Sequence, residues 1–353
     1  MTVYFTAAVP DPANHIVMLG QHGNWPASMH RFTPESLWAL DMAILTGRPL
    51  LIRGEPGIGK SQIARAAAQV LQVPLLTHVV DERTERDDLL YHYDAVARLG
   101  QAQVSSLMPT SDTGTDGSQQ QTWRAALREE NYVRPGVLWW ALDWENAADQ
   151  ALLFSRHCRP CNQPEEPTHL EPDSKAPCGP VVLIDEIDKA DPAVPNGLLE
   201  CLGSDGFRSS QLDRTISVPA GGKRPLVILT TNEERELPPA FLRRCLVVTV
   251  EFPEDDREAR QFLINDRARV RYNANQISDT ICNLVADKVL SERAAVAKKR
   301  TAGLARPGAS EFLDLISALV QFASQTSAAD RDSVQQAALQ QIATFALQKA
   351  AKE

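Results

Sequence analysis

Residues 54–61 read Gly54-Glu55-Pro56-Gly57-Ile58-Gly59-Lys60-Ser61, which meets the pattern G-x-x-x-x-G-K-[ST] at every position. Residues 49–53 before this stretch, Pro-Leu-Leu-Ile-Arg, predict a short buried strand, and residues 62–68 after it predict the first turns of a helix. Glycines let the backbone fold around a polyphosphate with its N–H groups pointing inward, and the helix start adds a favourable dipole. The sequence therefore predicts a phosphate-binding loop, in which Lys60 reaches the β- and γ-phosphates and Ser61 ligates Mg²⁺.

Two further apolar runs end in polar residues. Residues 181–184 are a continuous Val-Val-Leu-Ile run, typical of a strand buried on both faces of a parallel sheet, and they lead into Asp185 and Glu186. Asp185 suits the shell of a Mg²⁺ ion, and Glu186 suits the polarisation of an attacking water. Residues 226–231 lead in the same way into Asn232. In isolation Asn232 would be read as a turn residue, but its place after the other two motifs favours a role in orienting that water.

In this order the motifs resemble those of AAA+ ATPases, and within them the MoxR branch, over about residues 30–322. Residues 237–244, Leu-Pro-Pro-Ala-Phe-Leu-Arg-Arg, resemble the family segment LPEA-x-LDR, whose arginine reaches a neighbouring subunit's nucleotide. Arg244 falls on that arginine and Arg243 replaces the usual Asp, so either guanidinium is a candidate. Residues 134–138 resemble the MoxR element PGP-[IL]. The resemblance implies an ATPase that hydrolyses ATP at a subunit interface, with the catalytic residues Glu186, Asn232, Arg243 and Arg244.

The resemblance also predicts the fold class: an α/β P-loop NTPase core of the AAA+ type with a parallel sheet, followed by a small helical lid domain. The expected domains are an N-terminal extension at 1–32, the nucleotide-binding domain at 33–253, and the lid with a C-terminal helix at 254–353. Insertions are expected at about 100–125 and 145–180. Related proteins have a nucleotide-sensing arginine near the place of Phe312; Arg306 is the best substitute here, with Lys299 and Arg300 behind it. The expected ATP- and Mg²⁺-binding residues are Gly54, Glu55, Pro56, Gly57, Ile58, Gly59, Lys60, Ser61, Asp185 and Arg306, with Ser61 and Asp185 as the metal ligands.

Local patterns predict the remaining elements. A helix is expected from Pro34, which Thr33 caps, to a stop at Gly47. A second strand is expected at 75–80, a hairpin at 207–218, and a lid helix with its apolar stripe at Phe312, Leu315, Ile316, Leu319 and Val320. Residues 84–93 resemble a family stretch that carries a central-pore loop, and they read equally well as a solvated helix start.

Composition sets the class of protein. The chain has 353 residues and a net charge of -9, which argues against general binding of duplex DNA. No apolar stretch approaches the roughly 20 residues that a bilayer requires, and the N-terminus does not resemble a signal peptide. Six cysteines in a chain of this length do not resemble a disulfide framework. We expect a cytoplasmic enzyme that is not bound to a membrane.

Two stretches have the composition of insertions. Residues 105–121 are rich in Ser, Thr, Asp, Gly and Gln, which predicts a flexible surface loop. Cys158 and Cys161, with Cys178 downstream and His157 and His169 nearby, form part of a zinc-ribbon pattern. A second close cysteine pair is missing and the surrounding prolines fit a mobile loop equally well, so no zinc site is predicted.

The expected work is the remodelling or activation of a client protein that the sequence does not name. A homo-oligomeric ring, a hexamer by resemblance, is implied. A second hypothesis is a nucleic-acid-associated motor subunit that drives a nuclease or defence complex; the acidic balance makes it the weaker one. A third is a scaffold that uses ATP only to assemble, against which the intact set Lys60, Glu186 and Asn232 speaks.

Overall fold

The computed structural model describes residues 4–12, 15–107, 124–161, 164, 176–299 and 306–347. The chain divides into two compact units, and each is described by itself. The first unit comprises Met1–Tyr4, Trp38–Leu51 and Ala67–Val247. The second comprises Phe5–Leu37, Ile52–Ala66 and Val248–Glu353.

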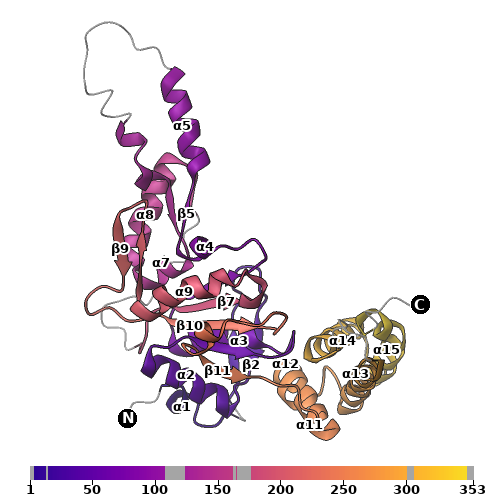
Figure 1. Cartoon of the computed structure of the whole chain (residues 1–353). Helices are drawn as coiled ribbons and strands as arrows, with labels where there is room; N and C mark the ends of the chain where they lie inside the picture. Colours follow the sequence, from indigo (N-terminus) through magenta and orange to yellow (C-terminus); the bar gives the residue numbers. More distant parts are fainter. Residues whose placement is uncertain are drawn as a thin grey trace, which may run out of the picture. The chain divides into compact units, whose positions relative to one another are not determined.

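The central element is a five-stranded sheet of order β11-β3-β10-β7-β4. Its strands are β3 (Leu50–Arg53), β4 (Leu75–Val79), β7 (Val181–Asp185), β10 (Leu226–Thr231) and β11 (Leu246–Thr249). β7 pairs in parallel with β10, Ile184 facing Leu229, and with β4, Ile184 facing His78. Every residue of β10 is buried, as are the four apolar residues of β7, because a strand in the middle of a covered sheet meets helices on both faces. The predicted α/β core with a parallel sheet is confirmed (Figure 1).

Helices and a hairpin follow the sheet strands in the order that the sequence predicts. The helix α2 (Pro34–Thr46) begins where the Ser36 N–H donates to the Thr33 hydroxyl at 3.2 Å, and it ends at Gly47, whose φ is 66°. The remaining helices around the sheet are α3 (Lys60–Leu71), α7 (Val137–Leu142) and α9 (Ala193–Ser204), and the predicted hairpin forms as β8 (Gly206–Ser209) and β9 (Arg214–Ser217).

Residues 84–93 form a short helix and a strand. The helix α4 (Arg86–Leu90) opens on a capping box between Glu85 and Asp88, and β5 (Tyr91–Tyr93) follows and pairs with β6 (Val133–Pro135). The helical interpretation of this stretch is therefore confirmed for its first half. Its alternative role as a pore loop stays a prediction.

The region between β5 and β7 carries most of the first unit's aromatic core. Trp139 on α7 is fully buried, as is Phe154 on α8 (Trp144–His157), which also buries Ala147 and Ala151. The second expected insertion therefore starts as a packed helix, because α8 has an apolar face at helical spacing that the prolines after it obscure in the sequence. Of the first expected insertion, the structure describes the part that lies in α5 (Ala95–Leu107), which Figure 1 shows as a helix.

The second unit contains an N-terminal hairpin and the C-terminal helices. The hairpin pairs β1 (Val17–Leu19) with β2 (Ser28–His30). The helices are α11 (Asp256–Gln261), the π-helix η3 (Phe262–Ala268), α12 (Arg269–Arg271), α13 (Asp279–Lys299), α14 (Ala309–Phe322) and α15 (Arg331–Leu347). The predicted apolar stripe on α14 is confirmed for Phe312, Leu315, Ile316 and Leu319, which are buried against α13 and α15.

The described residues show no disulfide, no metal-binding cluster and no helix that could span a membrane. All six cysteines are free thiols, and burial raises the pKa of Cys158 to about 11 and that of Cys178 to about 12. Within the described ranges no group of three or more His, Cys, Asp and Glu side chains is arranged to hold a metal, and His169 lies outside these ranges. No helix in the same ranges is long and apolar enough to cross a membrane.

Candidate nucleotide site

The predicted phosphate loop adopts a backbone that only glycine tolerates. It follows β3 directly, and its three glycines Gly54, Gly57 and Gly59 have φ angles of 152°, 75° and 100°. A Cβ at Gly54 would lie 2.2 Å from the carbonyl oxygen of Val250, and one at Gly57 would lie 2.3 Å from the hydroxyl of Ser310. The backbone angle favours glycine at all three positions, and close approach adds to this at Gly54 and Gly57.

The side chain of Lys60 is buried and hydrogen-bonded to the backbone of the loop that precedes it. It is the first residue of α3, only 6% of it is exposed, and its Nζ donates to the carbonyls of Gly54 at 2.7 Å and Glu55 at 3.0 Å. The ammonium group is thus aimed into the loop's concave side, where inward-pointing amides would meet phosphate oxygens. Ser61 follows on the first turn of α3, as the pattern predicts.

Two lid arginines that the sequence analysis did not single out contact the loop in the second unit. Arg293 on α13 pairs with the Glu55 carboxylate at 2.6 Å and lies over the ring of Phe252. Arg267 on η3 donates to the carbonyl of Ile58 at 3.0 Å, and its burial lowers the pKa of the guanidinium to about 10. The predicted sensor Arg306 is exposed. Arg300, its alternative, lies outside the described residues.

In the first unit, Thr230 organises the acidic end of β7. Because β10 and β7 are in parallel register with Leu229 facing Ile184, the next residue, Thr230, comes opposite Asp185. The Thr230 hydroxyl donates to Asp185 Oδ1 and accepts from the Glu186 N–H at 2.9 Å. One buried hydroxyl therefore fixes both the predicted metal ligand and the backbone of the predicted base.

Both carboxylate oxygens of Glu186 are engaged. Asn232 Nδ2 donates to Oε1 at 2.9 Å, and Lys189 Nζ donates to Oε2 at 2.6 Å, which raises the pKa of Lys189. Glu186 itself has φ 60° and ψ 47°, the left-handed region that costs a non-glycine residue on the order of 1 kcal/mol or more. This turn carries the side chain off the line of β7 and toward Asn232.

Asp188 braces the loop after β10. It is 2% exposed, and its Oδ2 accepts from the Glu234 N–H at 2.9 Å while Oδ1 faces the Asn232 N–H at 3.4 Å. The contacts fix the backbone that presents Asn232. Sequence reasoning assigned no role to Asp188, Lys189 or Thr230; the only signal was that Asp188 follows the acids Asp185 and Glu186, and that Thr230 follows the apolar run 226–229.

The predicted finger arginines lie elsewhere in the first unit, after the short helix α10 (Pro239–Leu242). Arg243 and Arg244 are both exposed. Within the described part of the chain, neither guanidinium makes a hydrogen bond or an ion pair.

The structure brings three of the predicted catalytic and metal-binding residues together in the first unit. Asp185, Glu186 and Asn232 form one hydrogen-bonded group. The loop from Gly54 to Lys60 is formed within the second unit, and Arg243 with Arg244 stands free of both groups' hydrogen bonds.

A family model described as the AAA domain of the dynein-related subfamily matches residues 49–115. Two solved structures resemble the chain at a distance. A protein of Cytophaga hutchinsonii titled a "putative ATPase" has 14% identity and a TM-score of 0.33, with 90% of this chain and 88% of that one covered. A variant of RuvB from Thermotoga maritima has 12% identity and a TM-score of 0.38, with 86% and 67% covered. No curated protein matches.

The sheet order, the loop after β3 and the family match define the class: this is an AAA+ P-loop NTPase fold with a helical C-terminal part. The matched residues include the phosphate loop and β4, the part of the chain where nucleotide binding is expected. The more specific expectation of a MoxR-branch protein is treated as a proposal.

Proposed function

We propose that the chain binds and hydrolyses ATP. The observation that supports this most is the group at the end of β7, where Asn232 holds the carboxylate of Glu186 beside Asp185. A carboxylate with an amide partner is the arrangement that a general base for water needs. The sheet order sets β3, which leads into the phosphate loop, and β7 on either side of β10. In open α/β sheets, ligands bind outside the carboxyl ends of the strands.

In this proposal each group has a defined task. Lys60 and the loop amides bind the phosphates, and Glu186 takes the proton of the attacking water that Asn232 orients. Lys189 occupies one oxygen of Glu186, so that oxygen must be released before it accepts a proton. Ser61 and Asp185 are oxygen donors of the kind Mg²⁺ prefers, and the short contact of Asp185 with Thr230 orients its carboxylate. When bound, Mg²⁺ would neutralise charge on the phosphates.

The site is proposed to be completed by a second copy. Arg243 and Arg244 are exposed cations without a partner in the described chain, and such arginines stabilise the charge of a transferred phosphoryl group. A homo-oligomeric ring would supply one copy's arginines to the next copy's nucleotide. The expected domain limits at 1–32, 33–253 and 254–353 stay part of this proposal, as does the sensor role of Arg306. The contacts of Arg267 and Arg293 with the loop make them competing sensor candidates.

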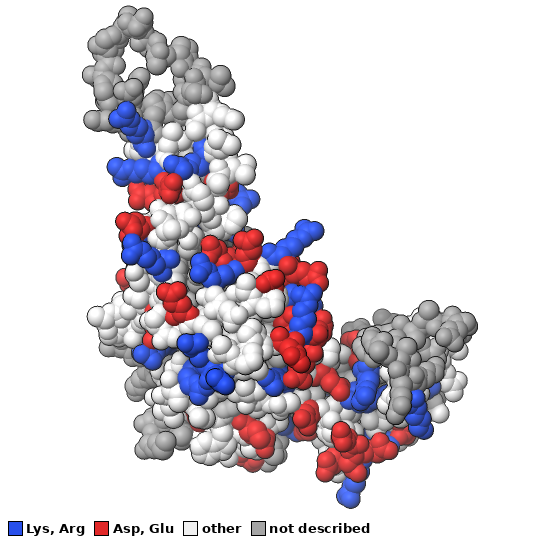
Figure 2. All heavy atoms as spheres, viewed as in Figure 1, with Lys and Arg blue, Asp and Glu red and all other residues white. Residues whose placement is uncertain are grey.

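The work driven by ATP is proposed to be the remodelling or activation of a client protein, as in the MoxR branch. The alternative is a motor subunit that acts on nucleic acid. On the face in Figure 2 acidic and basic side chains are interspersed, without a continuous basic area of the kind that tracks a phosphate backbone. Together with the net charge of -9, this favours a protein client.

The proposal is tested by steady-state turnover of ATP and GTP with Mg²⁺, with Lys60→Ala as the inactive control. We expect ATP turnover that the control abolishes, and a weaker response to GTP, because the sequence has no Asn-Lys-x-Asp guanine-reading element. Turnover no higher than that of Lys60→Ala would overturn the assignment as an ATPase. Stimulation of ATP turnover by DNA or RNA would instead favour the alternative, a motor subunit that acts on nucleic acid.

A further inference from the structure

Arg48 lies in the short connection between α2 and β3. Its guanidinium donates hydrogen bonds to three consecutive backbone carbonyls of the finger segment, which is residues 241–245. Nη2 donates to the carbonyl of Arg243 at 2.7 Å and to that of Cys245 at 2.9 Å, and Nε donates to that of Arg244 at 3.1 Å. All three acceptors follow α10, so the cation also lies at the carbonyl end of a helix, where positive charge is favourable. No role for Arg48 follows from the sequence motifs.

The finger segment is buried at both ends and exposed between them, and the N–H groups of Arg243 and Arg244 donate to the carbonyls of Pro239 and Phe241. Phe241 is fully buried and Cys245 is 5% exposed, whereas Arg243 and Arg244 between them are exposed. The segment is therefore a short arch whose side chains leave the protein surface. Its backbone carbonyls are the part that another residue can hold, and Arg48 holds three of them.

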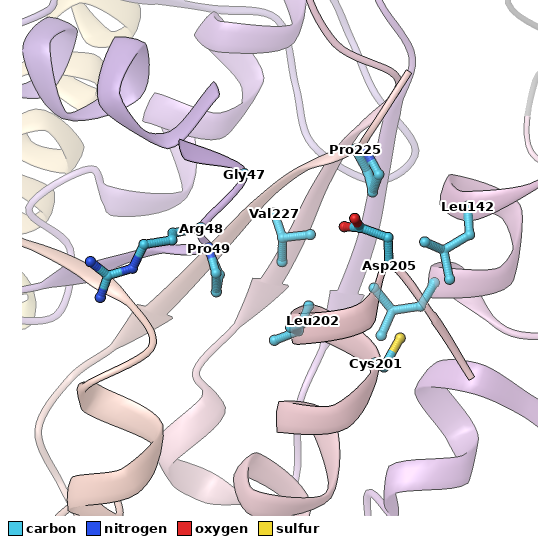
Figure 3. A pocket seen from close by; sticks show the side chains of 10 residues that line it. Gly47, Arg48, Pro49, Leu142, Cys201, Leu202, Asp205, Pro225 and Val227 are labelled. Carbon is cyan, nitrogen blue, oxygen red and sulfur yellow. The ribbon is translucent and has the colours of Figure 1, made fainter. Parts of the chain in front are cut away.

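An open cavity lies beside the arch, where Arg48 contacts it. The cavity has a volume of about 280 Å³, and its lining includes Arg48, Arg244, Leu199 and Leu202. A smaller pocket next to it shares Arg48, Pro49 and Leu202, and Figure 3 shows the Arg48 side chain extending away from the apolar residues of that lining. Close packing does not fill the space beside the arch, so hydrogen bonds set its position there.

We propose that Arg48 is a positioning residue for the finger arginines: it fixes the backbone that presents Arg243 and Arg244 to a second copy of the chain. This inference rests on the proposed shared site. A shift of the arch by about 1 Å would misplace a guanidinium against a phosphoryl group, and displacements of that size can cost about 100-fold in rate. Lysine cannot replace Arg48, because three carbonyls in a row need the fork of several N–H donors that a guanidinium provides.

The test compares Arg48→Ala and Arg48→Lys with Arg224→Ala. Arg224 lines the same cavity but pairs with Asp205 at 2.7 Å and makes no bond to the arch, so it is a matched control for charge and location. We expect both Arg48 variants to keep wild-type affinity for ATP while turnover falls about 10- to 100-fold, and Arg224→Ala to keep its turnover. Wild-type turnover in folded Arg48→Lys and Arg48→Ala would overturn the proposal.

Two further measurements separate positioning from general damage. Adding Arg48→Ala to the variant Arg243→Ala/Arg244→Ala should lower turnover no further, since the same step is already lost; an additive loss would contradict the proposal. Mixing Arg48→Ala subunits with Lys60→Ala subunits should restore activity, because the intact phosphate loop of one copy then meets the correctly held arginines of the other. Mixtures that assemble without recovery would place the defect in the subunit's own site and overturn the inference.

The result also distinguishes this inference from the proposed function. If Arg243→Ala/Arg244→Ala keeps wild-type turnover, the shared site itself is wrong. If that variant is inactive while both Arg48 variants are normal, the shared site stands and only the role of Arg48 fails. Should Arg48→Ala not fold, as judged by its melting transition, Arg48→Lys decides the question, since it retains the charge and the side-chain length.

Discussion

The end of β7 and the finger segment are opposite in one respect. At the strand end every predicted catalytic side chain is held within the chain: Asp185 by Thr230, and Glu186 by Asn232 and Lys189. At the finger segment the backbone is held, by Arg48, but the side chains of Arg243 and Arg244 have no partner among the described residues. One half of the proposed chemistry is thus complete in a single copy, and the other half is presented outward. This difference is the reason for proposing a shared site.

The largest expected effect comes from the outward half. Replacing both finger arginines by alanine removes charge that faces the transferred phosphoryl group, and arginines of this type are worth about 10³–10⁵ in rate. We expect turnover to fall by that order while ATP affinity, measured by titration of a fluorescent analogue, is unchanged. Turnover within tenfold of the wild-type rate would contradict the proposed role of Arg243 and Arg244 in phosphoryl transfer.

The inward half is tested by Glu186→Gln. Glutamine keeps an oxygen for Asn232 but cannot take a proton from water, so turnover should fall on the order of 10²-fold or more at unchanged ATP affinity. Glu236→Gln, an exposed acid beyond the same loop, is the control and should be unaffected. Near-normal hydrolysis by Glu186→Gln would show that another group activates the water.

The phosphate loop provides a third, backbone-level test. Gly57→Ala places a Cβ on a residue with φ 75° and against the hydroxyl of Ser310, so we expect weaker ATP binding and a stability loss of about 1–3 kcal/mol. Gly100→Ala on the helix α5 is the control: a Cβ there meets nothing within 4 Å, and stability should rise by up to about 1 kcal/mol. Denaturant titration measures both. Unchanged binding by Gly57→Ala would count against the loop's role.

A smaller effect is expected from His30 on β2. Burial, together with the nearby Arg267 and Arg271, lowers the pKa of this imidazole to about 3, and its Nε2 has no hydrogen-bond partner. Because the unfolded chain takes up the proton near pH 6.5, this group contributes stability above that pH. The contribution is lost by about 1.4 kcal/mol per unit as the pH falls from 6.5 toward 3.

His30→Phe removes the titrating ring while keeping an aromatic next to Phe32. We therefore expect the variant's unfolding free energy to depend less on pH between about 6.5 and 4 than that of the wild type, as measured by denaturant titration at several pH values. Parallel pH curves for the two proteins would show that His30 is not buried in the neutral form.

The sequence predicts the loop and the strand ends well because their requirements are local. Gly57 is specified by a backbone angle, and Asp185 by its place after an apolar run. Thr230 and Lys189 escape prediction because their roles depend on strand register and on the left-handed turn at Glu186. Neither is visible in a spacing pattern.

The two arginines that contact the phosphate loop could not be predicted from the sequence, for another reason. Arg267 and Arg293 are two of many arginines on helical segments, and which of them meets the loop depends on how η3 and α13 pack. The choice of Arg306 followed from resemblance to a family motif that this chain matches only in part, and Arg306 is exposed. Arg48 could not be predicted because no motif links a connection before β3 with carbonyls almost 200 residues later, a separation of 196 for Arg244.

The most direct test of the shared site mixes two inactive proteins. Arg243→Ala/Arg244→Ala subunits have an intact phosphate loop and base, and Lys60→Ala subunits have intact arginines. We predict that each protein alone is inactive and that the mixture recovers part of the wild-type ATP turnover, because some interfaces pair an intact loop with intact arginines. Mixtures that co-assemble but stay inactive, or a finger variant that remains active as a monomer, would contradict the account.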